Sequence, residues 1–289
     1  MAVNLLTIIL AFNYIVYNVA AEANNYTAYG YHNKIGIPRA QQLMWSESLS
    51  RIVGGSQVST TTAHPHQAGL VSLMTTGQTS ICGGSVISNT RVLTAAHCWW
   101  DGQLQAKQFT VVLGSLTIFS GGTRIVSSDV KVHPFWNVNA VTNDIAMIVI
   151  TRVQFDNHIQ AIPLPTNADV NQNFAGMKGT ITGFGKTSDS QNTFPQTTSM
   201  HETIVDTMTN QVCQQSFDFI LHNSHLCTSG VGGLGTCEGD SGGPITVIWN
   251  LRRTQIGIVS FGVGDGCQRG IPSVYTRVTT FLNWINANL

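Results

Sequence analysis

Short apolar runs constrain the fold of this chain more than any other feature. From Ile52 onward they are separated by stretches rich in Gly, Asn, Ser and Asp. Short runs between turn residues predict strands, and many strands at such spacing predict β-barrels or a β-sandwich, between which the pattern alone does not choose. The runs are 70–74, 92–94, 109–113, 145–150, 179–182, 245–249, 256–260 and 274–278.

Only one helix is expected, at the C-terminal end of the chain. Thr279 or Thr280 supplies a hydroxyl that can cap it. The stretch 162–173, which contains two prolines, is expected to connect two β units. The apolar residues that the helix would bury are Phe281, Leu282, Trp284 and Ile285.

The composition is that of a folded chain without an electrostatic footprint. Of the 289 residues, 43% are hydrophobic and 10% are charged, which supplies material for a sizeable core. Fourteen basic and fourteen acidic side chains cancel. We therefore expect neither nucleic acid nor an anionic membrane surface as a partner.

The N-terminal stretch predicts a secretory signal peptide over residues 1–23. Residues 4–20 are mostly apolar and are followed by small alanines. The alternative is a membrane anchor, since no lysine or arginine precedes the stretch, but Asn13 and Asn18 interrupt it and it is short. Secretion into an extracellular space is the expectation.

The six cysteines are an even number, as suits disulfides in an oxidising compartment. The sequence alone allows about fifteen pairings. A zinc site is the alternative, but no Cys-x-x-Cys pair occurs. Two histidine pairs, His64 with His66 and His222 with His225, lack an evident third ligand. We predict no metal and no cofactor.

Three local motifs carry the candidate chemistry. Ser241 lies in the glycine-rich turn 239–244, and such a serine becomes a nucleophile only beside a base and an orienting acid. His97 follows one apolar run and Asp144 comes just before another, so both groups are available. The alternative is three unrelated residues in turns.

The chain order His97, Asp144, Ser241 and these motifs resemble the trypsin and chymotrypsin family of secreted serine proteases. The resemblance covers residues 52–289. It implies an all-β fold of two antiparallel Greek-key β-barrels, about 68–160 and 174–278, with the active site in the cleft between them and a short C-terminal helix at about 279–289. Its implied disulfides are Cys82 with Cys98, Cys213 with Cys227, and Cys237 with Cys267.

The resemblance also implies a role for each catalytic group. His97 takes the proton of Ser241 and returns it to the leaving nitrogen, while Asp144 holds the imidazole tautomer. The backbone N–H groups of Gly239 and Ser241 form the oxyanion hole.

The sequence Arg51-Ile52-Val53-Gly54-Gly55 is similar to the activation sequence of the family's zymogens. Residues 24–51 would then be a propeptide, and cutting after Arg51 by a trypsin-like protease would free the Ile52 amine to pair with Asp240. No cysteine precedes Ile52. The propeptide is therefore expected to leave completely.

The residues around the implied specificity pocket are uncharged. Gly235 stands where trypsin-like members carry aspartate, and Thr236, Gly262 and Ser273 form the walls. Such a slot predicts binding of Phe, Tyr, Leu or Met, with Ser273 shifting the preference toward Leu or Met. Glu238 and Asp265 near the mouth either favour basic groups at outer subsites or are solvated loop charges.

Ser260, Phe261 and Gly262 resemble the edge segment on which an extended substrate adds a strand. The chain is most similar to insect digestive chymotrypsins. This implies a monomeric endopeptidase, with the gut lumen as its place, polypeptides as substrates and protein protease inhibitors as further partners. The alternatives are a processing or defence protease of narrow specificity and a non-catalytic protease homologue.

Overall fold

The computed structural model describes residues 26–50, 61–189, 199–263 and 266–289. The predicted signal peptide, the Arg51-Ile52 join and Asp265 lie outside the described residues. Within the described ranges, no helix is long and apolar enough to cross a membrane.

The first β unit is a seven-stranded antiparallel sheet in the order β5-β4-β1-β2-β3-β7-β6. Every apolar run predicted in this half is a strand, and the glycine-containing β2 pairs with β1 over residues 79–85. The strands are β1 (Gln67–Met74), β2 (Thr79–Ser88), β3 (Arg91–Thr94), β4 (Ala106–Leu113), β5 (Thr123–Ser127), β6 (Val130–Val132) and β7 (Ala146–Val149).

The second β unit is a closed antiparallel barrel in the order β10-β13-β12-β11-β8-β9. It closes because β10 pairs with both β13 and β9. The stretch 162–173 connects the two units, as expected. The strands are β8 (Lys178–Gly183), β9 (His201–Met208), β10 (His225–Thr228), β11 (Pro244–Trp249), β12 (Arg252–Phe261) and β13 (Ser273–Arg277). The prediction of an all-β fold of two barrel-like units is confirmed.

Each β unit has its own core of buried apolar side chains. Leu70, Phe109 and Met147 belong to the first core. Ile245 and Tyr275 belong to the second. Because the functional loops lie where these two rigid units meet, their positions are fixed by both cores.

The C-terminal helix is confirmed, but its predicted cap is wrong. Both threonines lie inside a 3-10 turn, Val278–Phe281, which precedes α4, Leu282–Ala287. Phe281 occupies the cap position and has no side-chain acceptor, while the Thr279 hydroxyl is buried without a partner among the described residues. Burial of Phe281, Leu282 and Ile285 against the first core holds the helix instead.

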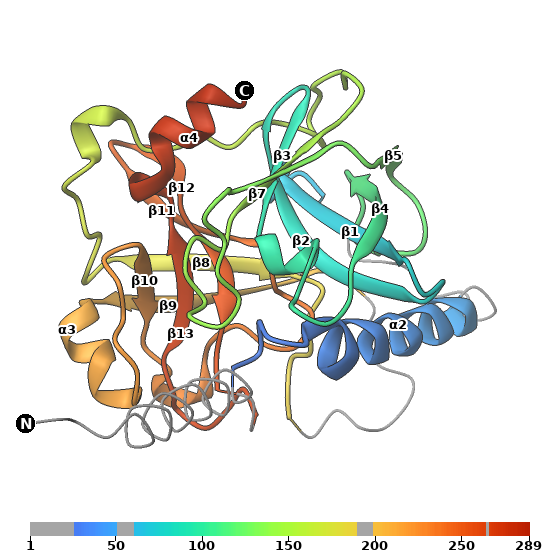
Figure 1. The fold of residues 1–289 in the computed structure, drawn as a ribbon. Helices are drawn as coiled ribbons and strands as arrows, with labels where there is room; N and C mark the ends of the chain where they lie inside the picture. Colours follow the sequence, from blue (N-terminus) through green and yellow to red (C-terminus); the bar gives the residue numbers. More distant parts are fainter. Residues whose placement is uncertain (1–25, 51–60, 190–198, 264–265) are drawn as a thin grey trace, which may run out of the picture.

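The prediction of a single helix is also wrong. Residues 32–36 form a π-helical turn, and α2, Ile37–Ser50, runs along one side of the first β unit (Figure 1). Ala40 and Leu43 of α2 are buried against Ile81, Ile118 and Phe184. This helix lies in the predicted propeptide.

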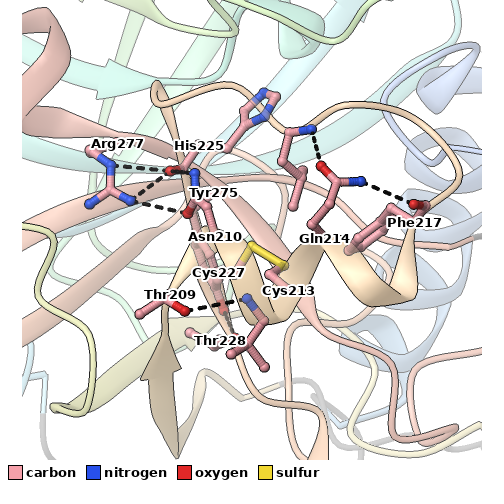
Figure 2. Close-up of a disulfide and its surroundings, with 12 residues drawn as sticks. Thr209, Asn210, Cys213, Gln214, Phe217, His225, Cys227, Thr228, Tyr275 and Arg277 are labelled. Atoms are coloured by element: carbon pink, nitrogen blue, oxygen red, sulfur yellow. Dashed lines mark hydrogen bonds between the residues drawn. A yellow bond between two sulfur atoms is a disulfide. The ribbon is translucent and has the colours of Figure 1, made fainter.

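A third helix, α3 (Asn210–Cys213), begins at Thr209, whose hydroxyl accepts the Val212 N–H at 3.3 Å. The disulfide between Cys213 and Cys227 joins α3 to β10 (Figure 2). Nearby, the Arg277 guanidinium donates to the His225 carbonyl at 2.8 Å. This network ties α3 and β10 to β13.

Candidate active site

His97 and Asp144 form a buried, hydrogen-bonded pair. His97 lies in a 3-10 turn, Ala96–Cys98, just after β3, and the disulfide from Cys98 to Cys82 of β2 anchors that turn. Asp144 precedes β7, the strand next to β3. The distance between His97 Nδ1 and Asp144 Oδ2 is 2.7 Å, and the His97 backbone N–H donates to Oδ1 at 2.9 Å.

The second β unit holds the Asp144 side of this pair. The Ser260 hydroxyl donates to Asp144 Oδ2 at 2.6 Å, and the Thr276 hydroxyl donates to the Asp144 carbonyl at 2.7 Å. With the carboxylate on Nδ1, the neutral imidazole carries its hydrogen there and its lone pair on Nε2. His97 therefore presents a base on Nε2.

Ser241 lies in the turn before β11, and this turn is pressed against the first β unit. The Gly83 N–H of β2 donates to the Ser241 carbonyl at 2.7 Å. Gly239 and Gly242 on either side have φ of +103° and +83°, a region that favours glycine. A Cβ on Gly83 would lie 2.9 Å from the Gly243 Cα, so main chain meets main chain at this contact.

A side chain from residues 26–50 covers the pair of His97 and Asp144. The Tyr31 ring lies 4.9 Å from the His97 ring, centroid to centroid, and both residues are fully buried. Burial raises the pKa of Tyr31, and a hydrogen bond with the Ser241 side chain acts in the opposite direction. His97 Nε2 is buried with no hydrogen-bond partner in the described part of the chain. The implied bond from Ser241 to His97 is thus not formed while Tyr31 is in place.

The Asp240 carboxylate is enclosed by backbone. It accepts the Gly185 N–H at 2.9 Å and the Cys237 N–H at 3.0 Å. Burial raises its pKa, whereas these N–H groups and the Arg39 charge act in the opposite direction. A cavity of about 230 Å³ that includes Gly183 and His201 adjoins the carboxylate. The predicted ammonium partner, Ile52, lies outside the described residues.

A larger cavity, of about 440 Å³, opens beside Ser241. A Cβ on Gly262 would meet nothing within 4 Å, so this wall is open. Gly235 lines the smaller neighbouring cavity, and a Cβ added to it would lie 2.8 Å from the Ser273 Oγ. The same Oγ accepts the Thr236 N–H at 3.2 Å. Of the predicted pocket residues, Thr236, Ser260, Phe261, Gly262 and Ser273 line the larger cavity.

Among the described residues, two charged side chains line the larger cavity. Glu238 is one of them and pairs with Lys186, whose Nζ lies 2.5 Å from the Glu238 Oε2. This ion pair partly neutralises the charge of Glu238. Lys34, from the predicted propeptide, also lines the cavity.

All six cysteines are paired, as Cys82–Cys98, Cys213–Cys227 and Cys237–Cys267. This is the pairing that the resemblance implies. The third bridge joins the turn before Ser241 to the segment that follows Gly266.

Two contributors to the site were not foreseen, Tyr31 over His97 and Arg39 beside Asp240. The sequence did contain a signal for the helix that carries Arg39. Pro38 is followed by fifteen residues without glycine or proline, and proline is favoured in the first turn of a helix. Nothing in the local sequence marks Tyr31, since its contacts come from distant residues.

A buried acid–base pair beside a serine, at the junction of two β units, defines a serine hydrolase of β-barrel architecture. The Trypsin family model matches residues 52–285. The chain belongs to the trypsin family and is a serine endopeptidase.

Named relatives span several activities. The chain is 34% identical to a collagenase of Hypoderma lineatum, over 82% of this chain and 87% of that protein. It is 37% identical to a brachyurin of Leptuca pugilator, over 81% of this chain and 96% of that protein. A chymotrypsin of Phaedon cochleariae is 34% identical, over 78% of this chain and 77% of that protein. A solved HL collagenase structure matches with a TM-score of 0.72 and 32% identity, over 82% of this chain and 98% of that chain.

Proposed function

We propose that this chain is a secreted zymogen of a digestive endopeptidase, cut after Arg51, that cleaves after large apolar residues. The observation that carries the specificity is that the predicted pocket residues which line the cavity beside Ser241, among them Thr236, Gly262 and Ser273, are uncharged. Desolvating a lysine or arginine there without a counter-charge costs several kcal/mol, whereas an apolar side chain gains from burial.

Secretion and activation have separate support. Three disulfides are typical of proteins that fold in an oxidising compartment. Activation is supported by the sequence at Arg51-Ile52 and by Asp240, a carboxylate beside a cavity, ready for a cation. A digestive role is supported by similarity to a chymotrypsin and a collagenase, and the expected substrates are unfolded or accessible polypeptides.

The specificity is tested with a peptide library after trypsin treatment. Cleavage after Phe, Tyr, Leu or Met is expected, and cleavage only after Arg or Lys would refute the proposal. Gly235→Asp combined with Ser273→Gly is the matched variant, because the Ser273 hydroxyl occupies the space that an added side chain needs. This pair should shift preference toward basic residues by about 100-fold, as expected when a buried charge gains a partner.

Activation and substrate range are tested on the same sample. N-terminal sequencing should return Ile52, and Ser241 should react with a serine-directed phosphonate only after cleavage. Digestion of casein supports a digestive enzyme, and collagen in parallel tests the activity that the collagenase relatives are named for. Cleavage of one sequence alone, with casein intact, would instead favour a processing or defence protease.

A further inference from the structure

We propose that residues 26–50 are a cleft-binding inhibitor of this same protease, which retains affinity for the active site after cleavage at Arg51. This inference rests on the proposed zymogen function. It concerns where the segment binds and what it blocks, whereas the resemblance implies only that the segment is cut and leaves.

The segment begins on the edge where a substrate is expected. Tyr26 forms an antiparallel bridge with Val263, just beyond β12. The Thr27 N–H donates to the Gly262 carbonyl at 3.3 Å, and the Gly262 N–H donates to the Thr27 hydroxyl at 3.0 Å. Residues 26 and 27 thus occupy the strand edge that an extended substrate needs.

The segment then turns away before it presents a peptide bond to Ser241. Residues 27–30 form a turn in which Gly30 has φ of +65° and donates its N–H to the Asp101 carbonyl at 3.0 Å. The Tyr31 side chain enters the site instead, and its hydroxyl donates to the Ile81 carbonyl at 2.9 Å. The Tyr31 phenol therefore covers His97, and the protease cannot hydrolyse it.

His32 and Gly36 fix this turn on β2. The His32 N–H donates to Asp101 Oδ2 at 2.7 Å, and His32 Nδ1 lies 2.8 Å from the Ser80 Oγ. A Cβ on Gly36 would lie 2.0 Å from that Oγ, so only glycine allows this approach. The fit is that of a dedicated binding segment.

Arg39 binds the loops around Asp240. Its side chain is 2% exposed, and Nη2 donates to the carbonyls of Phe184 at 3.1 Å and Gly185 at 3.0 Å. A Cβ on Gly239 would touch the Arg39 Cγ at 3.2 Å. Arg39 therefore places a cation near Asp240 in the uncut chain, where the Ile52 amine does not yet exist.

The far end of α2 binds a separate loop of the first β unit. The Glu47 carboxylate accepts the N–H groups of Ile118 and Phe119 at 3.1 Å and the Ser120 hydroxyl at 2.7 Å. Glu47 is 5% exposed, so this contact is buried. Docking thus depends on contacts spread over the segment, none of which requires a covalent link to residues 52–289.

The experiment uses the full chain, cut with immobilised trypsin that is then removed. Mass spectrometry verifies an intact fragment up to Arg51, because Lys34 and Arg39 are themselves trypsin sites. Hydrolysis per phosphonate-reactive Ser241 is then measured over a wide dilution series. Bound fragment predicts specific activity that rises on dilution toward a plateau, whereas specific activity independent of dilution overturns the proposal.

Variants assign the effect to the docked contacts. Tyr31→Ala should raise the inhibition constant of the fragment by about tenfold or more, as for a buried aromatic anchor. Glu47→Gln should also raise the inhibition constant of the fragment, although Glu47 does not contact Ser241. Gln41→Ala, an exposed position on α2, is the control and should behave as the parent. Equal inhibition by all four fragments would also overturn the proposal.

Size-exclusion chromatography separates this proposal from the proposed function. Co-elution of the fragment with the cut chain reports docking without any activity. Co-elution with no hydrolysis of apolar peptides at any dilution would refute the function but not the docking. Free elution of the fragment at micromolar concentration, with full hydrolysis, would refute the docking alone.

Discussion

Replacing Arg39 by methionine should destabilise the uncut chain. Methionine keeps the aliphatic packing against Gly239 but removes the donor to the carbonyls of Phe184 and Gly185 and the cation near Asp240. Each hydrogen bond from a charged donor contributes about 1.5 to 3 kcal/mol, and those to two buried carbonyls are lost. With a urea slope of about 3 kcal/mol per molar for a chain of this size, a loss of about 3 kcal/mol lowers the unfolding midpoint by about 1 M.

The assay is urea unfolding of the uncut, oxidised protein, followed by tryptophan fluorescence. The cut protein without its fragment gives the lowest midpoint expected, since the stability lost in Arg39→Met is not expected to exceed the free energy with which the segment docks. Arg39→Lys keeps a charge but not the planar guanidinium, so its unfolding midpoint should fall between those of the parent and Arg39→Met. An Arg39→Met midpoint within about 0.2 M of the parent would refute the reasoning, as would an equal shift from Gln41→Ala.

Two further predictions concern the protease itself. Ser260→Ala removes a 2.6 Å hydrogen bond to Asp144 and should lower kcat by about tenfold or more with little change in KM, because bonds to charged groups contribute about 1.5 to 3 kcal/mol; unchanged kcat would contradict this role. Burial lowers the pKa of His225 to about 4, and its Nδ1 accepts the His222 N–H while Nε2 lies 2.9 Å from the Val141 carbonyl. In the unfolded chain this histidine binds a proton near pH 6.5, so its contribution to the free energy of unfolding is complete above pH 6.5 and is lost as pH falls toward 4, by up to about 3 kcal/mol. Thermal unfolding of the parent and of His225→Gln at pH 7 and pH 5 measures this loss. An equal loss of stability between pH 7 and pH 5 in both proteins would contradict the prediction.

The sequence predicted the strands that are apolar and missed those that are not. All eight runs are strands, because continuous Val, Ile and Leu match a buried pleated surface. β2 contains Gly83 and Gly84, where side chains are excluded by close backbone contacts, and β9 has an exposed face. Both are specified by their neighbours in the sheet and not by local composition.

The candidate site was predictable where a motif carries its own chemistry. His97, Asp144 and Ser241 stand in short motifs whose residue types identify them. The pair of His97 with Asp144 follows from the adjacency of β3 and β7. By contrast, the hydroxyl of Ser273 above Gly235 depends on the register of a distant strand.

The docked segment escaped prediction for a different physical reason. Three apolar residues of its helix, Leu43, Met44 and Trp45, are consecutive and so do not share one face, which weakens the amphipathic pattern. Many of its contacts are polar and reach the side chain of Asp101 and backbone groups of residues 118, 119, 184 and 185. Such partners leave no periodic trace in the sequence.

The glycine contact between the two β units has a mechanical consequence. Gly83 and Gly243 meet through their main chains, beside the bond from the Gly83 N–H to the Ser241 carbonyl. A methyl group on Gly83 would lie 2.9 Å from the Gly243 Cα, so the two units would have to move apart and Ser241 would move away from His97. Chimeras that exchange one half between relatives should therefore stay active only if position 83 remains glycine.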